Sequence, residues 1–134
     1  MSFALNQIVS SNAAPRNVAV IGASGSIGGS ALDVIEHSEG RLRAGVLAVN
    51  RSVSKVVELA KRFKPDVVVV ADPDANREPL TELPNGTEVR FGPDALDEVV
   101  RRPEIDVVLL SIVGVAGLRV AWSALEAVSH VISA

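Results

Sequence analysis

The chain has 134 residues, of which 48% are hydrophobic and 22% charged, with a formal net charge of −3. This length suits a single domain with a real core, and the composition excludes a disordered or fibrous chain. The absence of cysteine excludes disulfides, thiolate metal sites and cysteine nucleophiles. Scattered basic residues argue against a nucleic-acid partner. The longest apolar stretch, residues 107–118, is too short to span a bilayer, and the N-terminus has no secretory signal pattern, so we expect a cytoplasmic protein without a membrane partner.

Strand and helix patterns alternate along most of the chain. Residues 1–16 are expected to form an N-terminal extension ahead of one domain over residues 17–134. The predicted strands are Asn17–Gly22, Ala44–Val49, Val67–Val70, Asp106–Ile112 and His130–Ser133, with a further brief strand at Glu88–Phe91. The predicted helices are Ser26–Glu36, Val53–Phe63, Asn76–Leu83 and Asp94–Arg101, and a last helix carries Leu118, Ala121, Trp122 and Leu125.

This alternation predicts an α/β fold, a doubly wound parallel sheet with helices on both faces, of the Rossmann-like dinucleotide-binding kind. Right-handed crossovers give the order 3-2-1-4-5 for the five main strands, numbered along the chain. The chain reverses between the first and fourth strands. A ligand is therefore expected in the crevice there, between the loop after the first strand and the loop of residues 111–117.

The loop after the first strand carries glycines at intervals of three, at Gly22, Gly25 and Gly28. A backbone approaches a pyrophosphate closely only where no Cβ intervenes, and the first turn of the next helix presents N–H groups to the anion. We assign Gly22 to the tight turn, Gly25 to the close approach and Gly28 to helix–strand packing, with a positive φ as a second possible reason for Gly25. The alternative is a glycine turn that binds nothing.

The helix that follows this loop has an apolar stripe made of Ile27, Ala31, Val34 and Ile35. Their offsets of 0, 4, 7 and 8 residues are typical of one helix face packed on a sheet. This context strengthens the interpretation of the glycines as a nucleotide-binding loop.

The end of the second strand is the position that meets the adenosine ribose in a dinucleotide fold. NAD-binding domains carry an acidic residue there, whereas this chain has Asn50, Arg51 and Ser52. A guanidinium offers a 2′-phosphate a planar fork of donors, so Arg51 indicates NADP rather than NAD. The alternative is that Arg51 is a solvated loop residue and that Ser52 only caps the next helix.

We identify no catalytic and no metal-binding residue. His37 is expected to complement the end of the first helix, and His130 to open the last strand. The carboxylates of the loop-rich middle are interpreted as helix caps and solvated groups, with metal ligation as the alternative: Asp72, Asp74, Asp94, Asp97 and Glu98. A hydride-transfer enzyme needs a substrate pocket besides the nucleotide site, so we expect this chain to be a piece of a longer protein.

Three segments together resemble the NADPH-binding N-terminal domain of the 1-deoxy-D-xylulose 5-phosphate reductoisomerase family. They are the segment from Gly22 to Ile35, the segment Asn50–Val53, and the specific Ile-Val-Gly-x-Ala-Gly-Leu element at residues 112–118. The resemblance implies that the nucleotide is held by Ser24, Gly25, Ser26 and Ile27, and by Asn50, Arg51 and Ser52 in place of a Gly-Lys-Asn-like triplet. Ala23 and Ser24 also depart from the usual Ser-Thr, although Ser24 keeps the hydroxyl and Arg51 keeps the charge.

The resemblance also implies what the full-length protein does. It isomerises 1-deoxy-D-xylulose 5-phosphate and reduces the product with NADPH to 2-C-methyl-D-erythritol 4-phosphate in the non-mevalonate isoprenoid pathway, as a homodimer with a divalent metal, Mg or Mn. In the family the sequence continues with Asn-Lys-Glu, an acidic metal site and a flexible loop over the phosphorylated sugar. This chain alone is therefore expected to bind NADPH and to be inactive.

Two other classes of function remain open. The glycine spacing is also similar to that of aspartate-semialdehyde dehydrogenase, dihydrodipicolinate reductase and extended short-chain reductases. A regulatory module that senses NADP(H), with no second domain, is the alternative that is not an enzyme.

Overall fold

The structure is a computed structural model that describes residues 14–111, 122 and 130–133. Within these residues, parallel strands form one sheet: β1 (Arg16–Ile21), β2 (Leu42–Val49), β3 (Val67–Val70), β4 (Glu88–Phe91), β5 (Val107–Leu110) and β6 (His130–Ser133). The spatial order is β4-β3-β2-β1-β5-β6. The predicted order 3-2-1-4-5 is confirmed, and the brief strand β4 extends the sheet beyond β3.

The helices of the described residues follow the predicted alternation. They are α2 (Ser26–Glu36), α3 (Val53–Phe63), α4 (Pro93–Val100) and the 3₁₀ helix η1 (Glu78–Glu82). The bounds of α2, α3, β3, β4 and β6 agree with the predictions, and the other elements differ at their ends, where hydrogen bonding is least regular. The predicted helix Asn76–Leu83 is only the short 3₁₀ turn η1. Of the helix expected around Leu118, only Trp122 is described, and it is helical.

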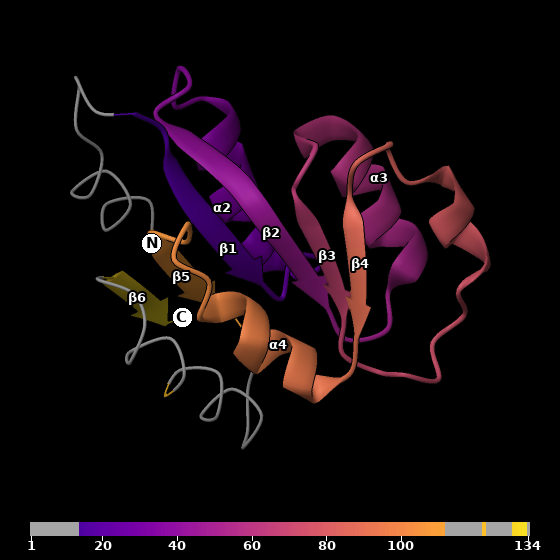
Figure 1. Ribbon diagram of the computed structural model, residues 1–134. Helices are drawn as coiled ribbons and strands as arrows, with labels where there is room; N and C mark the ends of the chain where they lie inside the picture. Colours follow the sequence, from indigo (N-terminus) through magenta and orange to yellow (C-terminus); the bar gives the residue numbers. More distant parts are fainter. Residues whose placement is uncertain (1–13, 112–121, 123–129, 134) are drawn as a thin grey trace.

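Helices cover both faces of the sheet, as the sequence predicts. Because side chains alternate along a strand, Val20, Leu47 and Val68 meet α2 and α3 in one buried cluster. On the opposite face, Ile21 and Val69 belong to a second cluster with residues of α4. Figure 1 shows α4 in front of the sheet and the other two helices behind it. The central strands are buried on both faces, which explains their unbroken apolar sequences.

The buried face of α2 differs from the predicted stripe at its first position. The buried residues are Gly28, Ala31, Leu32 and Ile35, and Val34 is half-buried. Ile27 is 41% exposed, so its assignment to the stripe is wrong. Gly28 is the residue that packs against the end of β1, and this contact turns Ile27 toward solvent at the carboxyl edge of the sheet.

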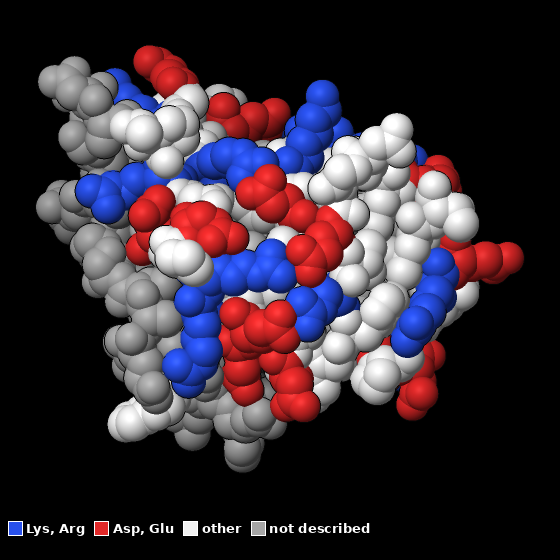
Figure 2. Space-filling model, in the orientation of Figure 1, with Lys and Arg blue, Asp and Glu red and all other residues white. Residues whose placement is uncertain are grey.

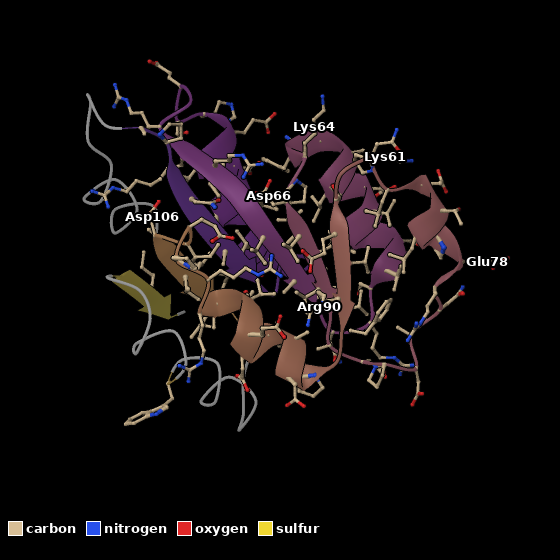
Figure 3. The ribbon with its side chains drawn as sticks, in the orientation of Figure 1. Lys61, Lys64, Asp66, Glu78, Arg90 and Asp106 are labelled. Atoms are coloured by element: carbon tan, nitrogen blue, oxygen red, sulfur yellow. The ribbon has the colours of Figure 1, made fainter. Side chains whose placement is uncertain are left out.

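Charged side chains of both signs are interleaved on the face shown in Figure 2. Arg90, labelled in Figure 3, lies 2.6 Å from Glu98, and Arg102 lies 2.9 Å from Glu88. Hydrogen bonds from these guanidinium groups lower the pKa of both glutamates. Exposed ion pairs of this kind contribute little to stability. None of the helices in the described ranges is sufficiently long and apolar to cross a lipid bilayer.

The amino edge of the sheet is held together by contacts within the chain. Arg43 donates two hydrogen bonds to Asp66, at 2.8 and 3.0 Å, and a third to the Lys64 carbonyl. The Asn17 N–H donates to Asp106 at 2.8 Å. Figure 3 shows Lys64, Asp66 and Asp106 on this side of the molecule. These groups already have partners, whereas the loops at the carboxyl edge leave polar groups exposed.

Candidate functional site

The candidate site is formed where the carboxyl ends of β1, β2 and β5 meet. Ile21 pairs with Ala48 on one side and with Leu110 on the other. The N–H groups of Gly22 and Ala23 both donate to the Ala48 carbonyl at 2.9 Å. The loop after β1 is therefore fixed beside the turn after β2. All seven predicted nucleotide-binding residues lie on these two loops or in the first turn of α2: Ser24, Gly25, Ser26, Ile27, Asn50, Arg51 and Ser52.

Gly22 makes the tight turn that the sequence predicts. Its φ is +93°, and a Cβ there would lie 2.9 Å from the Ser111 carbonyl oxygen. The Ser111 hydroxyl donates to the Ile21 carbonyl at 2.9 Å and lies 3.2 Å from the Gly22 carbonyl oxygen. Ser111 thus holds the start of the loop from the neighbouring strand. Sequence reasoning placed Ser111 beside the crevice but gave it no role, although a hydroxyl directly after a buried strand was a usable signal.

Gly28 packs α2 against the loop, which confirms its predicted role. A Cβ at Gly28 would lie 2.9 Å from the Ala23 Cα and closer still to the Gly22 carbonyl oxygen. These obstacles are backbone atoms, which cannot rotate away. The helix therefore approaches the end of β1 only because residue 28 has no side chain.

Gly25 differs from the other two glycines of the loop. Its φ is −84° and its ψ is 172°, so the suggested positive φ is wrong. The only atom near a Cβ at this position is the Gly22 carbonyl oxygen, at an ordinary contact distance of 3.6 Å. The fold itself therefore accepts a small side chain at residue 25. A requirement for glycine here would have to come from something that approaches the exposed surface of the loop.

The N-terminal ends of α2 and α3 both open onto this edge. Gly25 and Ser52 are their N-cap residues; Gly25 has no side chain, and the Ser52 side chain makes no capping hydrogen bond. Neither helix has an acidic residue in its first turn. The first N–H groups of a helix have no partner within the helix and carry partial positive charge. Two helix ends free of acidic side chains therefore favour anions at this edge.

The β2–α3 turn presents the cation that the sequence singled out. The Arg51 side chain is 70% exposed, and its Nε lies 3.0 Å from Asp72 Oδ2. Arg51 borders an open groove of about 320 Å³, which is lined by Arg51, Ser52, Val53, Ser54, Lys55, Asn76 and Pro79. Within the described ranges, no ion pair or hydrogen bond engages the Lys55 side chain.

Sequence reasoning missed two residues of this turn. Asp72 was interpreted as a helix cap or a solvated group, but the order of the sheet places it beside Arg51. Lys55 lies in the first turn of the helix that directly follows Arg51, and this closeness in sequence was a signal that both could line one groove. Asp72 could not be found in this way, because its proximity depends on the pairing of β2 with β3.

No catalytic constellation is apparent in the part of the chain that the structure describes, nor is there a group of three or more His, Asp or Glu residues that could hold a metal ion. His37 is the C-cap residue of α2, and its Nδ1 donates to the Asp33 carbonyl at 2.8 Å. Glu98 is paired with Arg90. The loop of residues 112–117 and the apolar element at 112–118 lie outside the described residues.

The arrangement at this edge agrees with comparisons of the chain with known proteins. The sequence model of the family described as 1-deoxy-D-xylulose 5-phosphate reductoisomerase matches residues 18–134. The chain belongs to this reductoisomerase family. The reductoisomerase of Ralstonia nicotianae is 39% identical over 120 residues, which cover 87% of this chain and 30% of that protein. The reductoisomerase of Nitrosococcus oceani is 40% identical over 104 residues, which cover 75% of this chain and 26% of that protein.

Solved structures of the same family share the fold. A reductoisomerase from Zymomonas mobilis in complex with NADPH matches with a TM-score of 0.78 and 35% identity, over 87% of this chain and 31% of that one. A DOX-P reductoisomerase in complex with magnesium matches with a TM-score of 0.82 and 30% identity, over 90% of this chain and 30% of that one. The chain thus spans about 30% of the length of the reductoisomerases that it matches.

Proposed function

We propose that this chain is the NADPH-binding domain of a 1-deoxy-D-xylulose 5-phosphate reductoisomerase. Residues 17–134 would form this domain, and residues 1–16 an extension ahead of it. NADPH would supply the hydride for the reduction. The observation that carries the proposal is the presence of glycine at residue 25. This residue is exposed at the N-terminal end of α2, and the fold itself does not require glycine there.

The loop after β1 would hold the pyrophosphate. Gly25 would let the backbone approach it, and the first N–H groups of α2 would donate to its oxygens. Ser24 and Ser26 would add hydroxyl donors from either side of Gly25. Ile27 is 41% exposed, and covering it with the nucleotide would remove apolar surface from water.

The β2–α3 turn would hold the adenosine ribose with its 2′-phosphate. Arg51 would donate to the phosphate, and Asn50 and Ser52 would contact the ribose or the phosphate from the same turn. The groove that Arg51 shares with the cationic Lys55 supports a site for an anion at this position. An acidic residue in place of Arg51 would instead favour NAD.

The chemistry of the whole enzyme is also a proposal for this chain. The full-length protein would isomerise 1-deoxy-D-xylulose 5-phosphate and reduce the intermediate with NADPH, as a cytoplasmic homodimer. The described residues do not fit a divalent metal, since they hold no cluster of ligands. We therefore assign metal binding and sugar binding to other parts of the full-length protein, and we expect the isolated chain to be inactive.

Calorimetry with NADPH, combined with an assay of NADPH oxidation, tests this proposal. The 134-residue chain is expected to bind NADPH with a measurable Kd. It is expected to show no turnover when 1-deoxy-D-xylulose 5-phosphate and Mg²⁺ or Mn²⁺ are added. Absence of binding by the folded chain would contradict the assignment of the nucleotide site. Turnover by the isolated chain would contradict the assignment of the catalytic groups to other parts of the protein.

A further inference from the structure

Asp72 occupies an unusual position for an acidic residue in a site proposed to bind a phosphate. It follows β3, and its carboxylate lies 3.0 Å from the guanidinium of Arg51. The Asp72 side chain is only 23% exposed, while that of Arg51 is 70% exposed. The partly buried carboxylate therefore serves as a fixed support for a side chain that otherwise projects into solvent.

The backbone and the other carboxylate oxygen of Asp72 are both held in place. Its N–H donates to the Asn50 carbonyl at 2.9 Å, which continues the pairing of β2 with β3 beyond the strand ends. Its carbonyl accepts from the Ala75 N–H at 3.2 Å. Its Oδ1 accepts from the Asp74 N–H at 2.9 Å. These bonds leave Oδ2 facing Arg51.

Asp72 Oδ2 lies 3.0 Å from the Arg51 Nε, and no ion pair or hydrogen bond within the described residues engages the terminal amino groups of Arg51. Within the described residues, Asp72 is the sole ion-pair partner of Arg51. A guanidinium held along one edge can still present its other edge to a phosphate as two parallel donors. A long, exposed arginine would otherwise lose rotamer freedom when it captures a ligand.

We propose that Asp72 is a positioning residue for the 2′-phosphate of NADPH and acts through Arg51. It holds Arg51 in the orientation that the phosphate requires, so that Arg51 is already ordered when the nucleotide arrives. This inference rests on the proposed function, because it concerns the same site. The proposal therefore means that a carboxylate, Asp72, strengthens the binding of an anion, the 2′-phosphate.

Charge alone predicts the opposite effect, and this difference makes the proposal testable. A carboxylate near a phosphate repels it, so its removal should strengthen NADPH binding if Asp72 acts only through its field. If Asp72 orders Arg51, its removal should weaken NADPH binding about two- to tenfold, the cost of immobilising one long side chain. NADH has no 2′-phosphate and should be unaffected in either case.

Asp72→Asn separates these effects, and Asp74→Asn is the matched control. Asparagine at residue 72 keeps an oxygen that can accept from the Asp74 N–H, so the local turn is retained. Asp74 is exposed, lies two residues away and makes no side-chain ion pair or hydrogen bond with the described residues, so its substitution removes the same charge without releasing Arg51. We expect Asp72→Asn to weaken NADPH binding and Asp74→Asn to leave it unchanged or to strengthen it.

The same substitution in an Arg51→Ala background completes the test. There, Asp72→Asn should no longer weaken NADPH binding, because the residue through which it acts is absent. In the chain without nucleotide, the Arg51 Nε–H resonance should be sharp in the parent and broadened in Asp72→Asn. An unchanged or tighter NADPH Kd in Asp72→Asn overturns the positioning role, even if Arg51→Ala confirms the 2′-phosphate site. If Arg51→Ala also leaves NADPH binding unchanged, the proposed site itself is wrong.

Discussion

The two loops of the candidate site are built in different ways. The loop after β1 is shaped by backbone contacts, since a Cβ at Gly22 or Gly28 would meet neighbouring backbone atoms. The β2–α3 turn is shaped by side chains, with Arg51 paired to Asp72 from the loop after β3. The first loop therefore tolerates almost no substitution at its two packed glycines. The β2–α3 turn tolerates substitutions as long as a cationic side chain with a suitable partner remains.

This difference explains why the departures from the family pattern fall where they do. All three residues of the β2–α3 turn differ from the Gly-Lys-Asn-like triplet that the resemblance implies. In the first loop Ala23 and Ser24 also differ, whereas the three glycines are retained. Steric limits at a backbone contact allow few solutions. A phosphate can be bound by several combinations of donors and charges. The following predictions test whether the two loops contribute to binding in these separate ways.

The largest effect is expected from Gly25→Val, which tests the backbone loop. A branched side chain at the exposed N-cap would occupy the space assigned to the pyrophosphate, so binding of both NADPH and NADH should be abolished. The fold should survive, because the nearest atom to a Cβ at residue 25 is 3.6 Å away. Calorimetry with both nucleotides and circular dichroism measure the two outcomes.

Gly29→Val is the matched control for this substitution. Gly29 lies one turn further along α2, and a Cβ there meets no atom within 4 Å. Nucleotide binding should therefore be retained. If Gly25→Val binds NADPH as tightly as the parent, the glycines form only a structural turn. If Gly25→Val unfolds, Gly25→Ala is the milder variant, and it should weaken the binding of both nucleotides.

Arg51→Ala is expected to have the next largest effect, and it tests the side-chain loop. Hydrogen bonds to charged groups contribute about 1.5–3 kcal/mol. NADPH binding should therefore weaken by about one to two decades while NADH binding stays nearly unchanged. Arg62→Ala is the control, because Arg62 is also an exposed, ion-paired arginine but lies at the far end of α3 from the site. Equal losses for both nucleotides would show that Arg51 supports the loop and does not contact the phosphate.

The backbone loop was largely predictable from the sequence, and so was the sheet around it. Gly22 and Gly28 satisfy local steric requirements that depend on residues close in sequence. The valines of β3 and Pro65 before it delimit a strand and the preceding helix without ambiguity. Strand order followed from the right-handed crossover rule. These features depend on local sequence or on general rules of chain geometry.

The side-chain part of the site could be predicted only in outline. Arg51 was recognised by its place after β2, but its partner Asp72 comes from the loop after β3. The outward position of Ile27 was missed because the periodicity of α2 does not show where its packed face begins. The positive φ suggested for Gly25 was wrong because glycine permits a positive φ without requiring it. The pairing of Arg51 and the exposure of Ile27 depend on tertiary contacts, whereas the extended conformation of Gly25 belongs to its N-cap position.

Gly28→Ala is expected to reduce stability, and it sharpens the contrast between packed and open glycines. The new Cβ would force α2 away from the end of β1, and overpacking of this kind costs about 1–3 kcal/mol. Gly29→Ala changes the next residue in open space, where alanine stabilises a helix by about 0.8–1 kcal/mol relative to glycine. Denaturant unfolding should therefore give opposite signs for these two neighbours. A Gly28→Ala variant as stable as the parent would show that the close helix–strand contact is not needed.

The smallest effect is expected from Lys64→Gly, at the edge of the sheet opposite the site. Lys64 is the C-cap residue of α3 and has a φ of +49°, a left-handed conformation that costs a side-chain-bearing residue about 1–2 kcal/mol. Part of the gain from glycine is lost because glycine makes the unfolded chain more flexible, which offsets about 0.4–1 kcal/mol. The Lys64 carbonyl keeps its bond from Arg43 in the variant. Lys64→Gly should therefore raise the free energy of unfolding by about 0.5–1 kcal/mol, whereas the control Glu58→Gly, inside α3, should lower it by a similar amount. A loss of stability in Lys64→Gly would mean that the lysine side chain stabilises the fold by more than its left-handed backbone conformation costs. A positive φ alone would then not require glycine, and glycine would be needed only where neighbouring atoms exclude a Cβ, as at Gly22.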